Sequence, residues 1–113
     1  MIRVIFTPLF KRRIKSLAKR YRTIKQDIQP ILDELEKGNF LGDQLSGLSI
    51  TAFKLRAKNS DIPTGKSGGY RLIYQVYSPE CVVLLLIYAK SDQSDVSTQV
   101  IEDAAKKASD KPS

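Results

Sequence analysis

A short stretch in the second half of the chain carries positive side chains at alternate positions. The positive residues are Lys54, Arg56 and Lys58, and apolar residues fill the positions between them. Because successive side chains of a β-strand point to opposite faces, this spacing predicts a strand with one apolar face and one row of cations. Cations held at strand spacing are suited to contact the phosphates of a nucleic acid.

A second group of candidate residues surrounds a glycine-rich turn. Gly68 and Gly69 can adopt the positive φ angles of a tight turn, and we expect them to place Arg71 at the start of a strand over residues 70–77. The guanidinium of Arg71 can donate two parallel hydrogen bonds to one phosphate, and a surface salt bridge is its alternative role. Lys66, in the same turn, is a further candidate for phosphate contact.

The last apolar run ends in a tyrosine and a lysine. Residues 82–87 are apolar on both faces, which predicts a strand covered on both sides. Tyr88 and Lys90 are two positions apart and therefore share a face. Tyr88 is either a core aromatic residue with a hydrated hydroxyl or a functional group. Lys90 is either a charge that prevents aggregation at the strand end or a catalytic group.

An amphipathic basic helix is predicted near the N-terminus. Thr7 is its expected N-cap and Pro8 its first residue. Eight cations and no acidic residue occur from position 11 to position 25. This charged face is either simply solvated or binds an RNA backbone or an acidic partner. The candidate RNA-binding residues on it are Lys15, Lys19 and Arg22.

A second, more acidic helix is predicted over residues 24–37, with Gly38 as its stop. It should pack antiparallel to the first helix. Because Pro30 falls inside the predicted helix, the start of this helix has two interpretations. Either Asp27 caps the helix, or Thr23 forms a capping box with Gln26 and the helix kinks.

Four segments have the composition of β-strands, and they are residues 1–6, 51–58, 70–77 and 82–90. The short connections between the last three imply an antiparallel meander. Residues 39–49 read as a loop, and apolar spacing between residues 96 and 108 predicts a final helix.

Composition limits the class of protein. The chain has 113 residues, 19 Lys and Arg against 12 Asp and Glu, and a net charge of +7, which favours polyanionic or acidic partners. We expect one domain over residues 1–109 and a disordered tail over residues 110–113.

One cysteine, Cys81, and no histidine exclude an internal disulfide and the usual zinc sites. With no apolar stretch of signal or transmembrane length, we expect a cytoplasmic protein.

The order of these elements and three segments resembles the RelE-like toxins of bacterial toxin–antitoxin modules, the RelE, HigB and ParE superfamily. The resemblance covers about residues 1–108, and it is carried by residues 53–56, 65–74 and 86–93. It implies an α+β fold of the microbial-ribonuclease type, β-α-α-β-β-β-α, in which a mainly antiparallel four-stranded sheet packs on an N-terminal helical hairpin. It also implies a toxin that cleaves mRNA on the ribosome, an antitoxin encoded by the adjacent gene, and operator DNA bound only through the antitoxin complex.

The resemblance also implies roles for individual residues. It places the phosphate-stabilising arginine at Arg71, the basic strand at Lys54 and Arg56, and the late-strand tyrosine at Tyr88. Lys66 and Lys90 are candidate additions. No metal or cofactor is needed, because the 2'-hydroxyl of RNA attacks the adjacent phosphate and expels the 5'-oxygen.

The chain has no histidine, so the imidazole group that usually acts as general base or acid in such a reaction is absent. A lysine among other cations is disfavoured as an ammonium ion, so Lys54 or Lys90 is the candidate base and Tyr88 the candidate acid.

Two other functions compete with the ribonuclease. A ParE-like poison of DNA gyrase would share the fold without the ribonuclease residues, and the presence of Lys54, Arg56, Arg71 and Tyr88 argues against it. A non-enzymatic basic module that binds RNA or the ribosome would bind in a salt-sensitive way without arresting growth.

Overall fold

The computed structural model describes residues 1–62, 69–93 and 95–110. Within these ranges the chain forms, in order, β1 (Arg3–Phe6), α1 (Pro8–Ala18), α2 (Ile24–Glu36), β2 (Asp43–Gln44), β3 (Ala52–Ala57), β4 (Tyr70–Ser78), β5 (Cys81–Ala89) and α3 (Thr98–Asp110). Lys66 and Gly68 lie outside the described residues. Helix α3 includes Asp110, which was assigned to the tail, and residues 111–113 are not described.

The five strands found in this part of the chain form one mixed sheet in the order β1-β5-β4-β3-β2. The pairings from β2 to β5 are antiparallel, whereas β1 pairs parallel to β5 at one edge. The α+β class is confirmed, but the prediction of four strands is wrong. Strand β2 escapes the sequence pattern because its two residues are both polar and exposed.

Glycine explains how β2 reaches β3. A Cβ atom at Gly42, which has a φ of +98°, would lie 2.5 Å from the carbonyl oxygen of Lys54. The backbone therefore passes closer to β3 here than any other residue would allow. The neighbouring Asp43 pairs with Lys54, so this contact borders the cationic strand.

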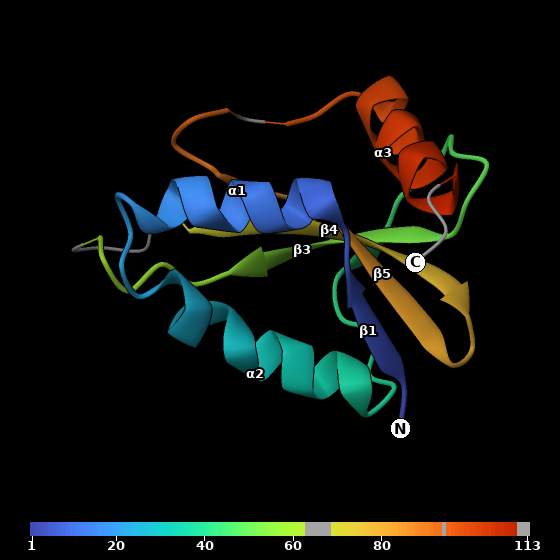
Figure 1. Cartoon of the computed structure of the whole chain (residues 1–113), viewed down its shortest axis with the longest axis horizontal. Helices are drawn as coiled ribbons and strands as arrows, with labels where there is room; N and C mark the ends of the chain where they lie inside the picture. The colour runs from blue at the N-terminus through green and yellow to red at the C-terminus, as the bar shows by residue number, and fades with distance from the viewer. Residues whose placement is uncertain (63–68, 94, 111–113) are drawn as a thin grey trace.

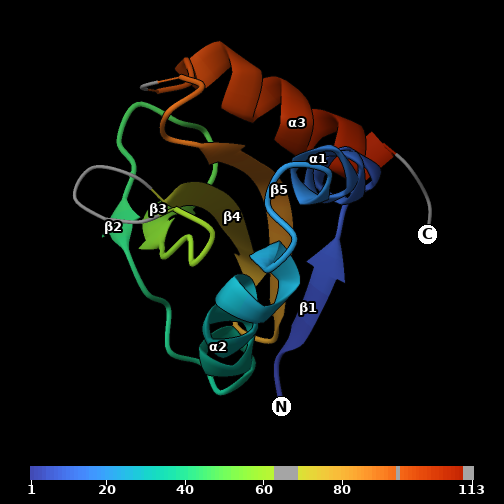
Figure 2. The ribbon, with the colours of Figure 1, turned by 90° about the vertical axis from the view of Figure 1, so that its left-hand side faces the viewer.

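Helices cover both faces of the sheet. Helices α1 and α2 share a core with one face, and Figure 1 shows them running in opposite directions, as predicted. Helix α3 packs on the other face, mainly through Ile101, Ala104 and Ala105, so that the strands lie between α2 and α3 in Figure 2. No helix among the described residues is long and apolar enough to cross a membrane.

The start of α1 follows the prediction. Thr7 occupies the N-cap, and its hydroxyl oxygen accepts a hydrogen bond from the Phe10 N–H at 3.2 Å. The same hydroxyl donates to the carbonyl of Leu84 at 2.8 Å. One buried threonine thus ends β1, begins α1 and ties both to β5.

The start of α2 differs from both interpretations. Thr23 is the N-cap, but its side chain makes no capping bond and donates instead to the carboxylate of Asp61 at 2.8 Å. Asp27 accepts a hydrogen bond from the Ser60 N–H at 2.8 Å. The first turn of α2 is therefore held to the loop that follows β3, and Pro30 lies inside the helix.

Candidate functional site

Three of the predicted site residues stand side by side on three neighbouring strands. Arg56 of β3 lies directly opposite Arg71 of β4, and Arg71 lies directly opposite Tyr88 of β5. Residues paired in this way point to the same face of a sheet. Lys54, two positions before Arg56, shares this face. The structure therefore brings Lys54, Arg56, Arg71 and Tyr88 together, on the face that α3 partly covers; we call these four residues the cationic row.

The position of Tyr88 depends on a β-bulge in β5. Ile73 pairs with Leu86 but the next residue, Tyr74, pairs with Leu84, so that Leu85 has no partner on β4. Leu85 and Leu86 consequently both pack on the α3 side. This extra residue changes the alternation, and it turns Tyr88 towards Arg71 rather than towards the core under α1 and α2.

Exposure increases along the cationic row. Tyr88 is 3% exposed and Arg71 is 9% exposed, whereas Arg56 at the other end is open to solvent. The guanidinium of Arg71 donates to the carbonyl of Tyr70 through Nη1 at 3.2 Å. The row is thus a strip whose inner end is almost dry, where a charge interacts more strongly than in water, and whose outer end a polyanion can reach.

A carboxylate that the sequence reasoning did not identify lies beside the cationic row. Asp95, in the segment before α3, accepts a hydrogen bond from Lys54, with 3.2 Å between Nζ and Oδ1. A hydrogen bond from the Val96 N–H, followed by Lys54 and Lys90, lowers the pKa of Asp95. No spacing signal marks this residue, because irregular chain brings it over the strands.

The hydroxyl of Tyr88 is kept protonated. Burial raises the pKa of Tyr88, and the negative charge of Asp95 raises it further, while Arg71 opposes the change. Among the described residues this hydroxyl has no hydrogen-bond partner of normal geometry. The oxygen atom itself is fully buried, so this protonated O–H group can donate to an incoming oxygen atom only if the side chains that cover it move aside.

The role suggested for Lys54 as a base has less support than its role as a cation. Its neighbour in space is the Asp95 carboxylate, with which it forms an ion pair. Lys90 lies past the end of β5 on the same face, half-buried, and also acts on Asp95. Lys58 follows the end of β3 and is exposed.

The cations predicted on the basic helix are separate from the cationic row. Lys15 lines a groove between α1 and α2, on the other side of the sheet, and Lys19 and Arg22 are exposed beyond the end of α1. Arg20, which follows α1, was not among the predicted RNA-binding residues. It forms an ion pair with Asp92 in the segment after β5.

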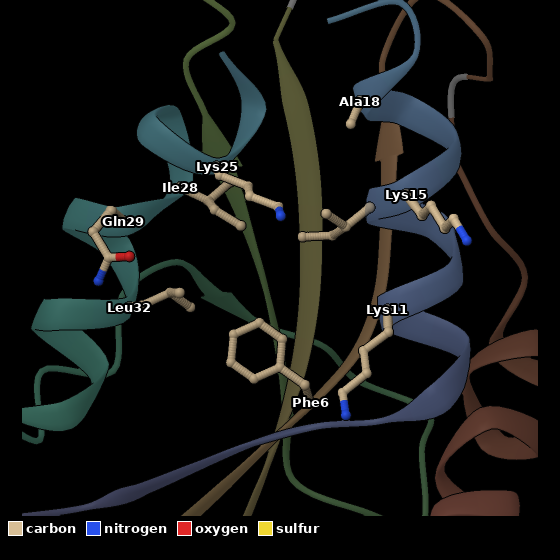
Figure 3. A pocket seen from close by; sticks show the side chains of 9 residues that line it. Phe6, Lys11, Lys15, Ala18, Lys25, Ile28, Gln29 and Leu32 are labelled. Carbon is tan, nitrogen blue, oxygen red and sulfur yellow. The ribbon is translucent and has the colours of Figure 1, made fainter. Parts of the chain in front are cut away.

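The groove between α1 and α2 is the second notable surface. It has a volume of about 540 Å³ and an apolar floor that includes Phe6, Ile28 and Leu32. In Figure 3, Lys25 reaches from α2 towards α1, and Lys11 lies beside Phe6. The groove therefore combines an apolar floor with a positive rim.

No protein-family model matches the chain, and no curated protein is significantly similar to it in sequence. The function proposed below is therefore supported by the sequence resemblance of residues 53–56, 65–74 and 86–93 and by the geometry of the cationic row.

Proposed function

We propose that this protein is a metal-independent endoribonuclease, a RelE-like toxin that cleaves mRNA on the ribosome. The observation that carries the proposal is the alignment of Arg56, Arg71 and Tyr88 across three strands, with Lys54 beside them. Four groups that can bind or protonate phosphate oxygens lie on one face, and the burial of the inner two makes their electrostatic effect strong.

The reaction needs the protein mainly to align RNA and to stabilise charge. The 2'-hydroxyl gives up its proton to a water molecule and its oxygen forms a bond to phosphorus, while the bond from phosphorus to the 5'-oxygen breaks and the 5'-oxygen takes up a proton, which leaves a 2',3'-cyclic phosphate and a 5'-hydroxyl. Arg71 and Lys54 stabilise the added negative charge on the phosphate, and the protonated Tyr88 donates a hydrogen bond to the departing 5'-oxygen. Arg56, at the exposed end, binds a neighbouring phosphate.

Activity on free RNA should be weak. The chain has no histidine to accept the 2'-hydroxyl proton, and Lys54 is paired with Asp95. Alignment of the mRNA by the ribosome can supply a large part of the rate enhancement, because a correctly oriented nucleophile needs less help from a base.

Substitution of Arg71 tests the proposal. Arg71→Gln should lower mRNA cleavage by about 100-fold or more, the usual effect of losing one donor to a developing charge, and should abolish growth arrest. Arg3→Gln, on the exposed edge strand β1, is the matched control and should remain fully toxic. Because Arg71 is buried, circular dichroism and thermal unfolding must show that the variant is folded. A folded Arg71→Gln chain with full toxicity would contradict the proposal.

The same induction experiment distinguishes the competing functions. Primer extension should detect cuts within translated codons shortly after induction. DNA breaks without mRNA cuts would indicate a gyrase poison, and salt-sensitive RNA binding without growth arrest would indicate a non-enzymatic module.

The proposed partner is an antitoxin encoded by the adjacent gene, and operator DNA is bound only through their complex. The groove between α1 and α2 supports this partner, because its apolar floor and the cations Lys11, Lys15 and Lys25 complement an amphipathic helix with acidic residues. We place the antitoxin helix in this groove.

A further inference from the structure

Two carboxylates in the segment between β5 and α3 neutralise cations from elsewhere in the fold. Asp92 pairs with Arg20 after α1, and Asp95 pairs with Lys54 of β3. They lie three residues apart in the sequence, yet only Asp95 touches the cationic row. This segment thus places one negative charge where a nucleic acid would place a phosphate.

We propose that Asp95 is a specificity-determining residue that competes with RNA for Lys54. In the absence of RNA its carboxylate takes the position of a phosphate oxygen, and RNA binding must displace it. Only RNA that is also held by other contacts, such as mRNA positioned on a ribosome, then binds strongly. The inference rests on the proposed function, since it concerns the same site.

The geometry makes this displacement easy. The side chain of Asp95 is 63% exposed and that of Lys54 is 29% exposed, so the pair is close to the surface and contributes little to stability. A phosphate diester can replace the carboxylate at Lys54 and also contact Arg56, which lies two positions further along β3 on the same face and is exposed.

Removal of the Asp95 carboxylate should change RNA binding in opposite directions for a competing residue and for a positioning residue. If Asp95 oriented Lys54 for catalysis, its removal would weaken binding or cleavage. If Asp95 competes with phosphate, its removal strengthens RNA binding, and the gain depends on Lys54.

The test measures binding of a 2'-O-methyl RNA oligonucleotide, which cannot be cleaved, by fluorescence anisotropy at low ionic strength. Asp95→Asn should bind about fivefold more tightly than the wild-type chain. Asp92→Asn is the matched control, because it removes one negative charge from the same segment without touching the cationic row. Its gain in binding free energy should be less than half of the gain of Asp95→Asn. In a Lys54→Gln background, Asp95→Asn should give no gain.

Equal or weaker binding by Asp95→Asn would overturn the inference, as would an equal gain from Asp92→Asn or a gain that persists without Lys54. These outcomes are separate from the fate of the proposed function. Wild-type cleavage of mRNA with no gain from Asp95→Asn would remove the inference alone. Tighter binding by Asp95→Asn without any mRNA cleavage would support competition and remove the nuclease.

Discussion

Arg56 and Arg71 lie directly opposite one another on β3 and β4. Two like charges in this relation repel each other and destabilise a sheet, and one of them, Arg71, is nearly buried. A phosphate between the two guanidinium groups would convert this repulsion into attraction, in agreement with the RNA binding proposed for this face.

This relationship predicts opposite effects on stability and binding. Arg56→Gln should raise the free energy of unfolding by about 0.2–1 kcal/mol, because it removes the repulsion, and should weaken RNA binding. Arg3→Gln on β1, opposite the uncharged Cys81, should change neither quantity appreciably. Urea unfolding and oligonucleotide titration measure the two effects. A less stable Arg56→Gln chain would show that the pair is structural.

Two buried tyrosines offer a test of the Tyr88 hydroxyl. Tyr88 and Tyr70 both have hydroxyl groups without a hydrogen-bond partner of normal geometry among the described residues, but they lie on opposite faces of the sheet. Replacing Tyr70 by phenylalanine should leave stability unchanged or slightly higher, because no hydrogen bond is lost, and replacing Tyr88 loses only a contact with Asp95 that lacks this geometry. Only Tyr88→Phe should reduce mRNA cleavage, by about 10- to 100-fold. Equal cleavage by the two variants would remove Tyr88 from the site.

The turn before Arg71 depends on Gly69. It has a φ of +86°, and a Cβ atom there would lie 2.4 Å from the carbonyl oxygen of Ala57. Gly69→Ala should therefore lower the free energy of unfolding by about 2 kcal/mol or more. Gly47, with a φ of +76° and no atom within 4 Å of an added Cβ, is the control and should lose about 1 kcal/mol. Equal losses in thermal unfolding would mean that the contact with Ala57 relaxes without cost.

Alkaline pH should destabilise the protein through its buried tyrosines. Burial raises the pKa values of Tyr70, Tyr74 and Tyr88 above their ordinary value of 10.0. Below about pH 10 these groups are protonated in both states and do not change stability with pH. Above it, the unfolded chain loses protons first, so the free energy of unfolding falls. Urea unfolding between about pH 9 and about pH 11 should show a shallower fall for Tyr70→Phe than for Tyr77→Phe, which changes an exposed tyrosine.

If the proposed antitoxin helix binds in the groove between α1 and α2, its binding should depend on the charge of the groove's rim. Lys11→Glu, combined with Lys25→Glu, should weaken binding of the adjacent-gene product by about tenfold or more, because it reverses two charges on the rim. Arg13→Glu, combined with Lys106→Glu, makes the same change of charge outside the groove and should have a smaller effect. Calorimetry with the purified antitoxin measures both. Equal weakening by the two double variants would place the helix elsewhere.

Much of the local structure was readable from short-range patterns. Alternation at Lys54 and Arg56 predicted a strand with a polar face, and Thr7 followed by Pro8 predicted the start of α1; both are confirmed. These predictions depend on interactions between residues within a few positions of each other, so composition and spacing suffice. Strand β2 and the true anchor of Thr23, which is Asp61, involve residues distant in sequence and could not be predicted in this way.

The sequence by itself identified the candidate residues for phosphate contact, and it determined that Lys54 and Arg56 share a face, because that relation follows from the two-residue period of one strand. Only the tertiary structure decided that Tyr88 joins them. Its direction depends on the bulge at Leu85, and simple alternation from Val82 and Leu84 would have placed it on the opposite face. The approach of Asp95 to Lys54 was likewise decided by the path of the chain before α3, since no local rule relates two residues that meet only when the sheet and the helix have packed.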